Sequence, residues 1–118
     1  MDSFSKSESK QLRALASLAY ERELSAALAQ LEGQFVDWRA GKLSPFDLSD
    51  AIHNFHDGTA RQLYVFYTGK PAPCVAHALA TGVLSEQEVS KDLASKLQTM
   101  VAFYRTEWPY AESRAPAV

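Results

Sequence analysis

Hydrophobic positions along this chain recur every three or four residues, the spacing typical of helices that cover one face of a core. Three long segments show this spacing, at residues 8–40, 45–68 and 85–107. No segment of any length alternates between apolar and polar positions in the manner of a half-buried strand. The pattern therefore predicts an all-α fold.

Residues with known preferences for helix ends separate the first two segments. Gly41 suits the position just past a helix, where a left-handed backbone is common. Ser44 and Pro45 suit the N-cap and the first turn of the next helix. Gly58 interrupts that helix only mildly, because a glycine inside a helix costs about 1 kcal/mol relative to alanine. We predict that the second helix ends near Thr68.

The C-terminal half of the chain predicts a short helix followed by a long one. The short helix covers 73–81 and ends at Gly82. Ser85 and Glu88 have the spacing of a capping box, so we expect the last helix to begin there. The predicted fold is an antiparallel helical bundle of three long helices plus one short helix. Its boundaries are a single helical domain over 8–108 and flexible tails at 1–7 and 111–118.

One apolar stripe on each long helix supplies the expected core. At about 100° per residue, the members of each stripe fall on one helix face. The short helix is expected to cover this core as a lid. The stripes are Leu24, Leu28, Leu31, Phe35 and Trp38; Leu48, Ile52, Phe55, Leu63 and Phe66; and Val89, Leu93, Leu97, Met100 and Tyr104.

The start of the first helix carries a second apolar face. Leu12, Leu15 and Ala19 lie roughly 140° around the helix from the stripe that begins at Leu24. An unbroken first helix would be about 50 Å long, which is too long for one compact core. We therefore expect either a break near residues 20–23 or an overhang whose apolar face packs on another chain. The alternative is that these side chains are exposed on a fraying helix.

A flank of histidine and tyrosine runs beside the apolar stripe of the second helix. It consists of His53, His56, Tyr64 and Tyr67. Such side chains combine an apolar body with a polar tip, and tyrosine is enriched at protein interfaces. The flank predicts a second packing partner for this helix, either another chain or a neighbouring helix of the same chain.

The second helix also carries residues able to bind a metal. Asp50 and His53 have a carboxylate-x-x-His spacing that resembles one element of di-metal helical bundles. Ligands in those bundles point inward, whereas Asp50 points away from the expected core. We therefore expect no metal and no cofactor. The alternative metal site consists of Asp50, His53 and Asp57.

Cys74 and His77 lie three residues apart near the start of the short helix. A helix N-terminus favours the thiolate form of cysteine, which would make Cys74 reactive. His77 falls opposite Val75 and Leu79, so we expect it to face solvent. The interpretation that we favour is a small cysteine packed in or near the core.

Composition and charge narrow the possible functions. The length of 118 residues fits one domain. The formal net charge of -2 argues against the basic surface that binds nucleic-acid phosphates. The spacing of Ala78 and Gly82 hints at a helix-turn-helix, but acidic residues follow where phosphate would lie. No run approaches the ~20 apolar residues that cross a bilayer, and the first ten residues lack the apolar centre of a signal peptide. We expect no nucleic-acid partner, no membrane contact and a cytoplasmic location.

These observations favour a small intracellular protein that acts through protein–protein contacts. It would be a regulatory, adaptor or antitoxin-like component without catalytic activity, and either a homo-oligomer, most simply a homodimer, or a subunit bound to another protein. The competing hypothesis is a metal-dependent or cysteine-dependent enzyme that uses the second and third helices. Such an enzyme needs a bound metal or a concave pocket that contains His53 or Cys74.

Overall fold

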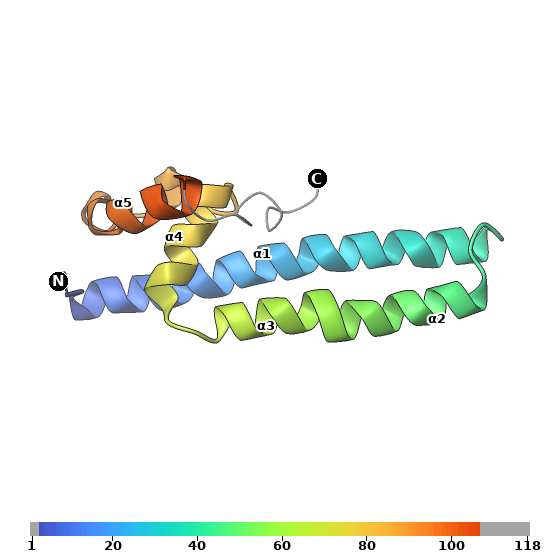
Figure 1. Ribbon diagram of the computed structural model, residues 1–118. Coiled ribbons are helices and arrows are strands. Elements are labelled where there is room, and N and C mark those ends of the chain that lie inside the picture. Colours follow the sequence, from blue (N-terminus) through green and yellow to red (C-terminus); the bar gives the residue numbers. More distant parts are fainter. Residues whose placement is uncertain (1–2, 107–118) are drawn as a thin grey trace.

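The computed structural model describes residues 3–106, and over this range the chain is all-α, as predicted (Figure 1). No residue between 3 and 106 lies in a strand. The tail expected at 111–118 lies outside the described residues. The elements are α1 (Lys6–Arg39), α2 (Pro45–Asn54), a π-helical turn (Phe55–Ala60), α3 (Arg61–Tyr67), α4 (Pro71–Thr81), a 3-10 turn (Glu86–Glu88) and α5 (Lys91–Thr106).

The helices do not all surround one common core. α1 runs antiparallel to a nearly continuous helix formed by α2, the π turn and α3 (Figure 1). α4 crosses the N-terminal half of α1, and α5 packs on α4 at the same end of the molecule. The chain is therefore elongated, with extents of 54 × 27 × 23 Å. Its radius of gyration is 16.8 Å, against about 13.5 Å expected for a compact domain of this length.

The part of the molecule that projects beyond α4 and α5 is a two-helix hairpin. We call residues 24–65 the arm; it comprises the second half of α1, α2, the π turn and most of α3. Two helices form a single layer, so no element within residues 3–106 covers the outer faces of both. Leu28, expected in the core, is 46% exposed here. The stripe from Leu24 to Trp38 is therefore only partly covered by the described part of the chain.

α4 is the centre of the core and not a lid. Every residue from Cys74 to Leu79 is buried. The sequence of α4 is apolar on nearly all sides, which is the pattern of a helix enclosed by its neighbours. Leu93 and Leu97 of α5 belong to the same core cluster and are completely buried.

α1 is unbroken and packs on different partners along its length. Leu12, Leu15 and Ala19 are buried in the core cluster that contains α4 and α5. The second half of α1 contacts α2 and α3, which approach it from another side (Figure 1). The rotation between the two apolar faces thus reflects two neighbours within one chain. The prediction that Leu12, Leu15 and Ala19 pack on another chain is wrong for this reason.

α1 also begins earlier than predicted, so part of the tail expected at 1–7 is ordered. The amide of Ser5 donates to Oε1 of Glu8 at 2.9 Å, and the amide of Glu8 donates to Oγ of Ser5 at 3.1 Å. This capping box satisfies two amides at the helix start. Lys96 of α5 donates from Nζ to the Ser3 carbonyl at 3.1 Å and to Glu8 at 2.7 Å. These bonds tie the beginning of the described chain to the core.

The π turn changes which residues of α3 face inward. A π turn holds one residue more than an α turn, so it shifts the phase of the residues after it by about 100°. On an unbroken α-helix, Tyr67 would lie about 100° from Leu48. With one residue taken up by the turn around Gly58, the two come into line, and both are buried. Gly58 therefore marks a larger interruption than the mild one predicted.

The last helix begins later than predicted. Ser85 and Glu88 form the expected capping box, but it closes only the 3-10 turn. Val89 then adopts an extended backbone, with φ -115° and ψ 137°, and its side chain is buried. Ser90 accepts a hydrogen bond at Oγ from the amide of Leu93 at 3.3 Å and so caps α5. The extended residue between the two turns separates the capping box from the helix.

Candidate functional site

The predicted histidine and tyrosine flank is divided between the surface and the core. His53, His56 and Tyr64 are exposed on the arm. Tyr67 is buried because the π turn rotates it inward, so its assignment to an interface with a partner is wrong. An interface through His53, His56 and Tyr64 stays a prediction.

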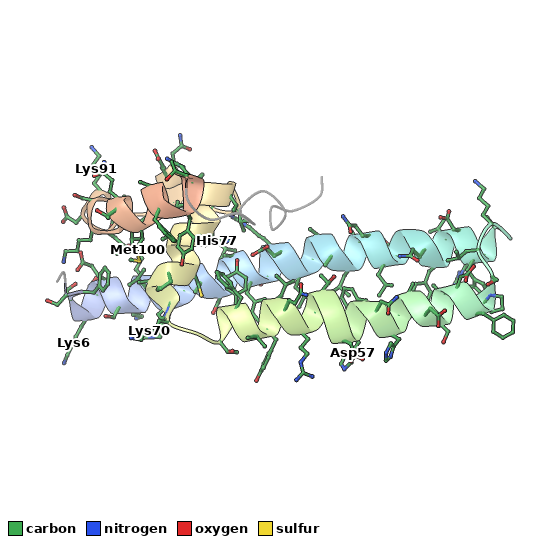
Figure 2. The ribbon with its side chains drawn as sticks, in the orientation of Figure 1. Lys6, Asp57, Lys70, His77, Lys91 and Met100 are labelled. Atoms are coloured by element: carbon green, nitrogen blue, oxygen red, sulfur yellow. The ribbon has the colours of Figure 1, made fainter. Side chains whose placement is uncertain are left out.

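His56 and Tyr64 of this flank border a shallow groove on the outer side of the arm. The groove has a volume of about 500 Å³. Figure 2 shows Asp57 on the side of the hairpin that faces away from α1. The lining of the groove combines apolar surface with positive and negative charges, which suits contact with another molecule. The lining residues are His56, Asp57, Ala60, Arg61, Tyr64 and Val65.

The three alternative metal ligands do not converge. Nε2 of His53 lies 3.1 Å from Oδ2 of Asp57, one turn along the arm. Asp50 instead lines a different hollow, between α1 and α2. Within residues 3–106, no three side chains of the metal-binding types are grouped as ligands of one ion.

Cys74 and His77 are both inside the core. Cys74 is 2% exposed, and its Sγ donates a hydrogen bond to the carbonyl of Phe66 at 3.3 Å. His77 is completely buried, with its ring 5.0 Å from that of Phe66 and 5.2 Å from that of Tyr104. The prediction that His77 faces solvent is wrong because neighbouring elements enclose all sides of α4. The packed cysteine that we favoured is confirmed.

A buried carboxylate is the polar feature that sequence reasoning missed. Glu23 of α1 is 5% exposed and accepts a hydrogen bond from the hydroxyl of Tyr67. The ring of Tyr67 also stacks on that of Tyr20, with centroids 5.1 Å apart. Buried carboxylates are rare unless they are paired. The signal was present in the sequence, since Glu23 follows Ala19 by four residues and so continues the N-terminal apolar face.

Aromatic rings continue from this pair through the core to α5. Phe66 contacts Tyr67 edge-on, with centroids 5.0 Å apart, and His77 lies between Phe66 and Tyr104. Burial raises the pKa of Tyr104 above its ordinary value, and the electrostatic effect of nearby Cys74 adds to it. These groups make a polar and aromatic link between the base of the arm and the core. None of these side chains lines the groove beside His56 and Tyr64 or the hollow that contains Asp50.

An ion pair holds α1 to the connection between α4 and α5. Arg22 donates from Nη1 and Nη2 to the two carboxylate oxygens of Glu88, at 2.8 and 2.6 Å. Nη1 also donates to the carbonyl of Val83 at 2.9 Å. The hydrogen bonds from Arg22, followed by that from the Ser85 amide, lower the pKa of Glu88 to about 2.

This pair predicts a loss of stability in acid. A carboxyl group whose pKa is lower in the folded chain stabilises the fold above its unfolded pKa, here 4.5. The contribution should disappear as the pH falls from about 4.5 to about 2. We therefore expect Glu88→Gln to melt below wild type at pH 7 and the two curves to converge near pH 2. Differential scanning calorimetry across this range measures the effect, and an unchanged gap at low pH would contradict it.

Exposed apolar side chains are concentrated on the arm. Of the nine large hydrophobic residues exposed within the described range, eight belong to the arm, and the ninth is Phe103 of α5. Phe46, at the start of α2, is 81% exposed. A groove of about 470 Å³ also follows the open face of α1 in the arm. The eight residues are Leu28, Phe35, Val36, Trp38, Phe46, Ile52, Tyr64 and Val65.

Comparisons with known proteins find no relative of this chain. No protein-family model matches the chain. Neither curated proteins nor solved structures give a match. No helix within residues 3–106 has the length and apolar character needed to cross a membrane. The geometry of this chain is therefore the sole basis for proposing its function.

Proposed function

We propose that this protein acts through protein–protein contacts made by its arm, as a regulatory, adaptor or antitoxin-like component without catalytic activity. The observation that carries the proposal is the concentration of exposed apolar side chains on the arm. Isolated exposed apolar residues are ordinary, but apolar side chains concentrated on one part of a molecule are typical of an interaction surface.

The architecture supports the same proposal. The compact end of the molecule buries its apolar residues in one cluster, whereas the arm projects from it as a single layer (Figure 1). An isolated pair of helices has little buried area to offset the cost of ordering it. A partner that covers the arm would supply that area. We expect a homo-oligomer or a complex with another protein.

The competing enzyme hypothesis has less support from the geometry. It required a concave site that contains His53 or Cys74. Cys74 is enclosed by other side chains of the core, which separate it from a substrate in solution. His53 is exposed, and its contact with Asp57 lies on the protein surface. Neither arrangement offers the enclosed pocket with converging polar groups that is typical of active sites.

A capture experiment with matched variants tests the proposal. The purified chain is used as bait with a cross-linker, and every bound protein, including unlabelled copies of the bait, is quantified by mass spectrometry. The arm variant carries Val36→Ser and Phe46→Ser, at side chains that are 59% and 81% exposed. We expect it to recover at least about tenfold less of the specific partner, because truncating side chains that become buried in an interface removes binding energy.

The control for this experiment is Phe103→Ser, which removes a 48% exposed aromatic ring from α5, outside the arm. It should leave recovery of the partner unchanged. Circular dichroism of all three chains checks that the fold is kept. If no bound protein depends on the arm more than on Phe103, the proposal is wrong.

A further inference from the structure

The open face of α1 in the arm has the spacing of a helix that packs against another helix. Leu24, Leu28, Leu31, Phe35 and Trp38 alternate at steps of four and three residues, which is the heptad pattern of helix pairs. Part of this stripe is already covered, because Leu24 packs against the core cluster and Leu31 is half-buried at the hollow between α1 and α2. Leu28 and Trp38 remain 46% and 40% exposed. The stripe therefore has exposed apolar surface on which a further helix, from outside the arm, can pack.

A groove on this face is bordered by two opposite charges. Leu28, Leu31, Phe35 and Val36 form its apolar part, and Glu32 and Arg39 lie beside them. The two charged residues are seven positions apart, so they lie on the same side of the helix, about 10 Å from each other along its axis. At that distance they do not pair with one another. Each is exposed and available to an opposite charge on a partner.

We propose that a second copy of this chain occupies the groove, with the two α1 helices antiparallel about a two-fold axis between Phe35 and Val36. This inference rests on the proposed function and names its partner. An antiparallel pairing with that axis places Glu32 opposite Arg39 of the second copy, and by symmetry places Arg39 opposite Glu32 of that copy. Phe35 then meets Val36 of the second copy at the centre.

The charge pattern selects this partner and this direction. A helix that presents one negative and one positive group at this separation is complementary to its own reverse, so an identical chain satisfies both charges at once. A parallel pairing in register would instead place Glu32 beside Glu32 and Arg39 beside Arg39. Like charges across helices oppose association and help fix orientation. In this pairing the two α1 helices overlap over residues 32–39, so the contact is made by the ends of the two arms.

Sedimentation equilibrium of the full chain tests the pairing. Wild type should approach twice the chain mass of 13.1 kDa at micromolar concentration. Glu32→Arg sets two positive side chains against each other at both charge contacts, and Arg39→Glu sets two negative side chains against each other there. Each variant alone should dimerise at least about tenfold more weakly than wild type. An equimolar mixture should recover dimerisation, because both contacts are then between opposite charges.

The charge control is Asp37→Arg, which makes the same kind of reversal on an exposed residue of α1 that does not line this groove. It should dimerise like wild type. Recovery by the mixture but not by either variant alone supports the antiparallel pairing. A wild-type monomer at all accessible concentrations overturns it, as does a dimer that is insensitive to the two charge reversals. If the chain is a monomer but still captures a different protein through the arm, the second copy is excluded while the proposed function stands.

Discussion

Replacing Leu97 with alanine is expected to lower the free energy of unfolding by about 2–5 kcal/mol. Leu97 is completely buried in the cluster formed by α1, α4 and α5. The substitution removes apolar contacts, and the surrounding helices can relax only partly into the space left behind. Urea denaturation followed by circular dichroism at 222 nm (the helix signal) measures the change. Dilute protein keeps self-association from contributing to it.

The matched control is Leu28→Ala, which makes the same chemical change on the arm. Leu28 is 46% exposed, so much of its side chain is in water already. We expect a loss below about 1 kcal/mol. Leu28 belongs to the stripe that the sequence pattern assigned to the core, so the pair of variants separates two arrangements of α1. Equal losses at both positions would mean that the second half of α1 is covered as fully as the core around Leu97.

Removing the hydroxyl of Tyr67 is expected to cost about 1–3 kcal/mol. Tyr67→Phe keeps the ring that stacks on Tyr20 but deletes the donor to the buried carboxylate of Glu23. Hydrogen bonds to a charged or buried group contribute more than those at the surface, because water cannot replace them. Thermal or urea unfolding measures the loss. Tyr64→Phe is the control, since Tyr64 is 59% exposed and should tolerate the change.

A double-mutant cycle tests whether this loss comes from the pair itself. Glu23→Met replaces the carboxylate by an apolar side chain of similar length. Replacing both partners of a buried hydrogen bond by apolar groups costs less than breaking it from one side. We therefore expect the double variant to be more stable than the sum of the single losses predicts, by about 1 kcal/mol or more. Additive losses would mean that the bond between Tyr67 and Glu23 contributes little to the fold.

The candidate surface was only partly predictable. His53, His56 and Tyr64 were identified from their shared position on the second helix, and the structure leaves them exposed on the arm. Tyr67 was misplaced because a π turn is not visible in a hydrophobic pattern, although Gly58 marks where the pattern is interrupted. The groove along α1 was not predicted from the sequence, for another reason. Its residues have the spacing of a core stripe, and a sequence does not show how far a second helix covers such a stripe.

Local chemistry along the chain determined the helices and their ends. Oγ of Ser44 accepts a hydrogen bond from the amide of Asp47 at 3.0 Å. The position of Ser44, before Pro45 and the apolar run, predicted this cap. Gly41 and Gly82 have φ of 77° and 84°, which side chains other than glycine rarely adopt. These preferences act within one or two turns of helix. They are therefore readable from a single sequence without knowledge of the elements that pack against the helix.

Only the tertiary structure decided which apolar face forms the core. α1 carries two faces, and nothing local distinguishes the one around Leu12 from the one around Leu28. The choice depends on where α4 comes to lie, because a helix that is apolar on all sides must be enclosed by several neighbours at once. α4 meets that need against the first half of α1 and against α5. The burial of His77 and Glu23 results from that placement, as does the exposure of the arm, because contacts between distant segments are set by the packing of whole helices.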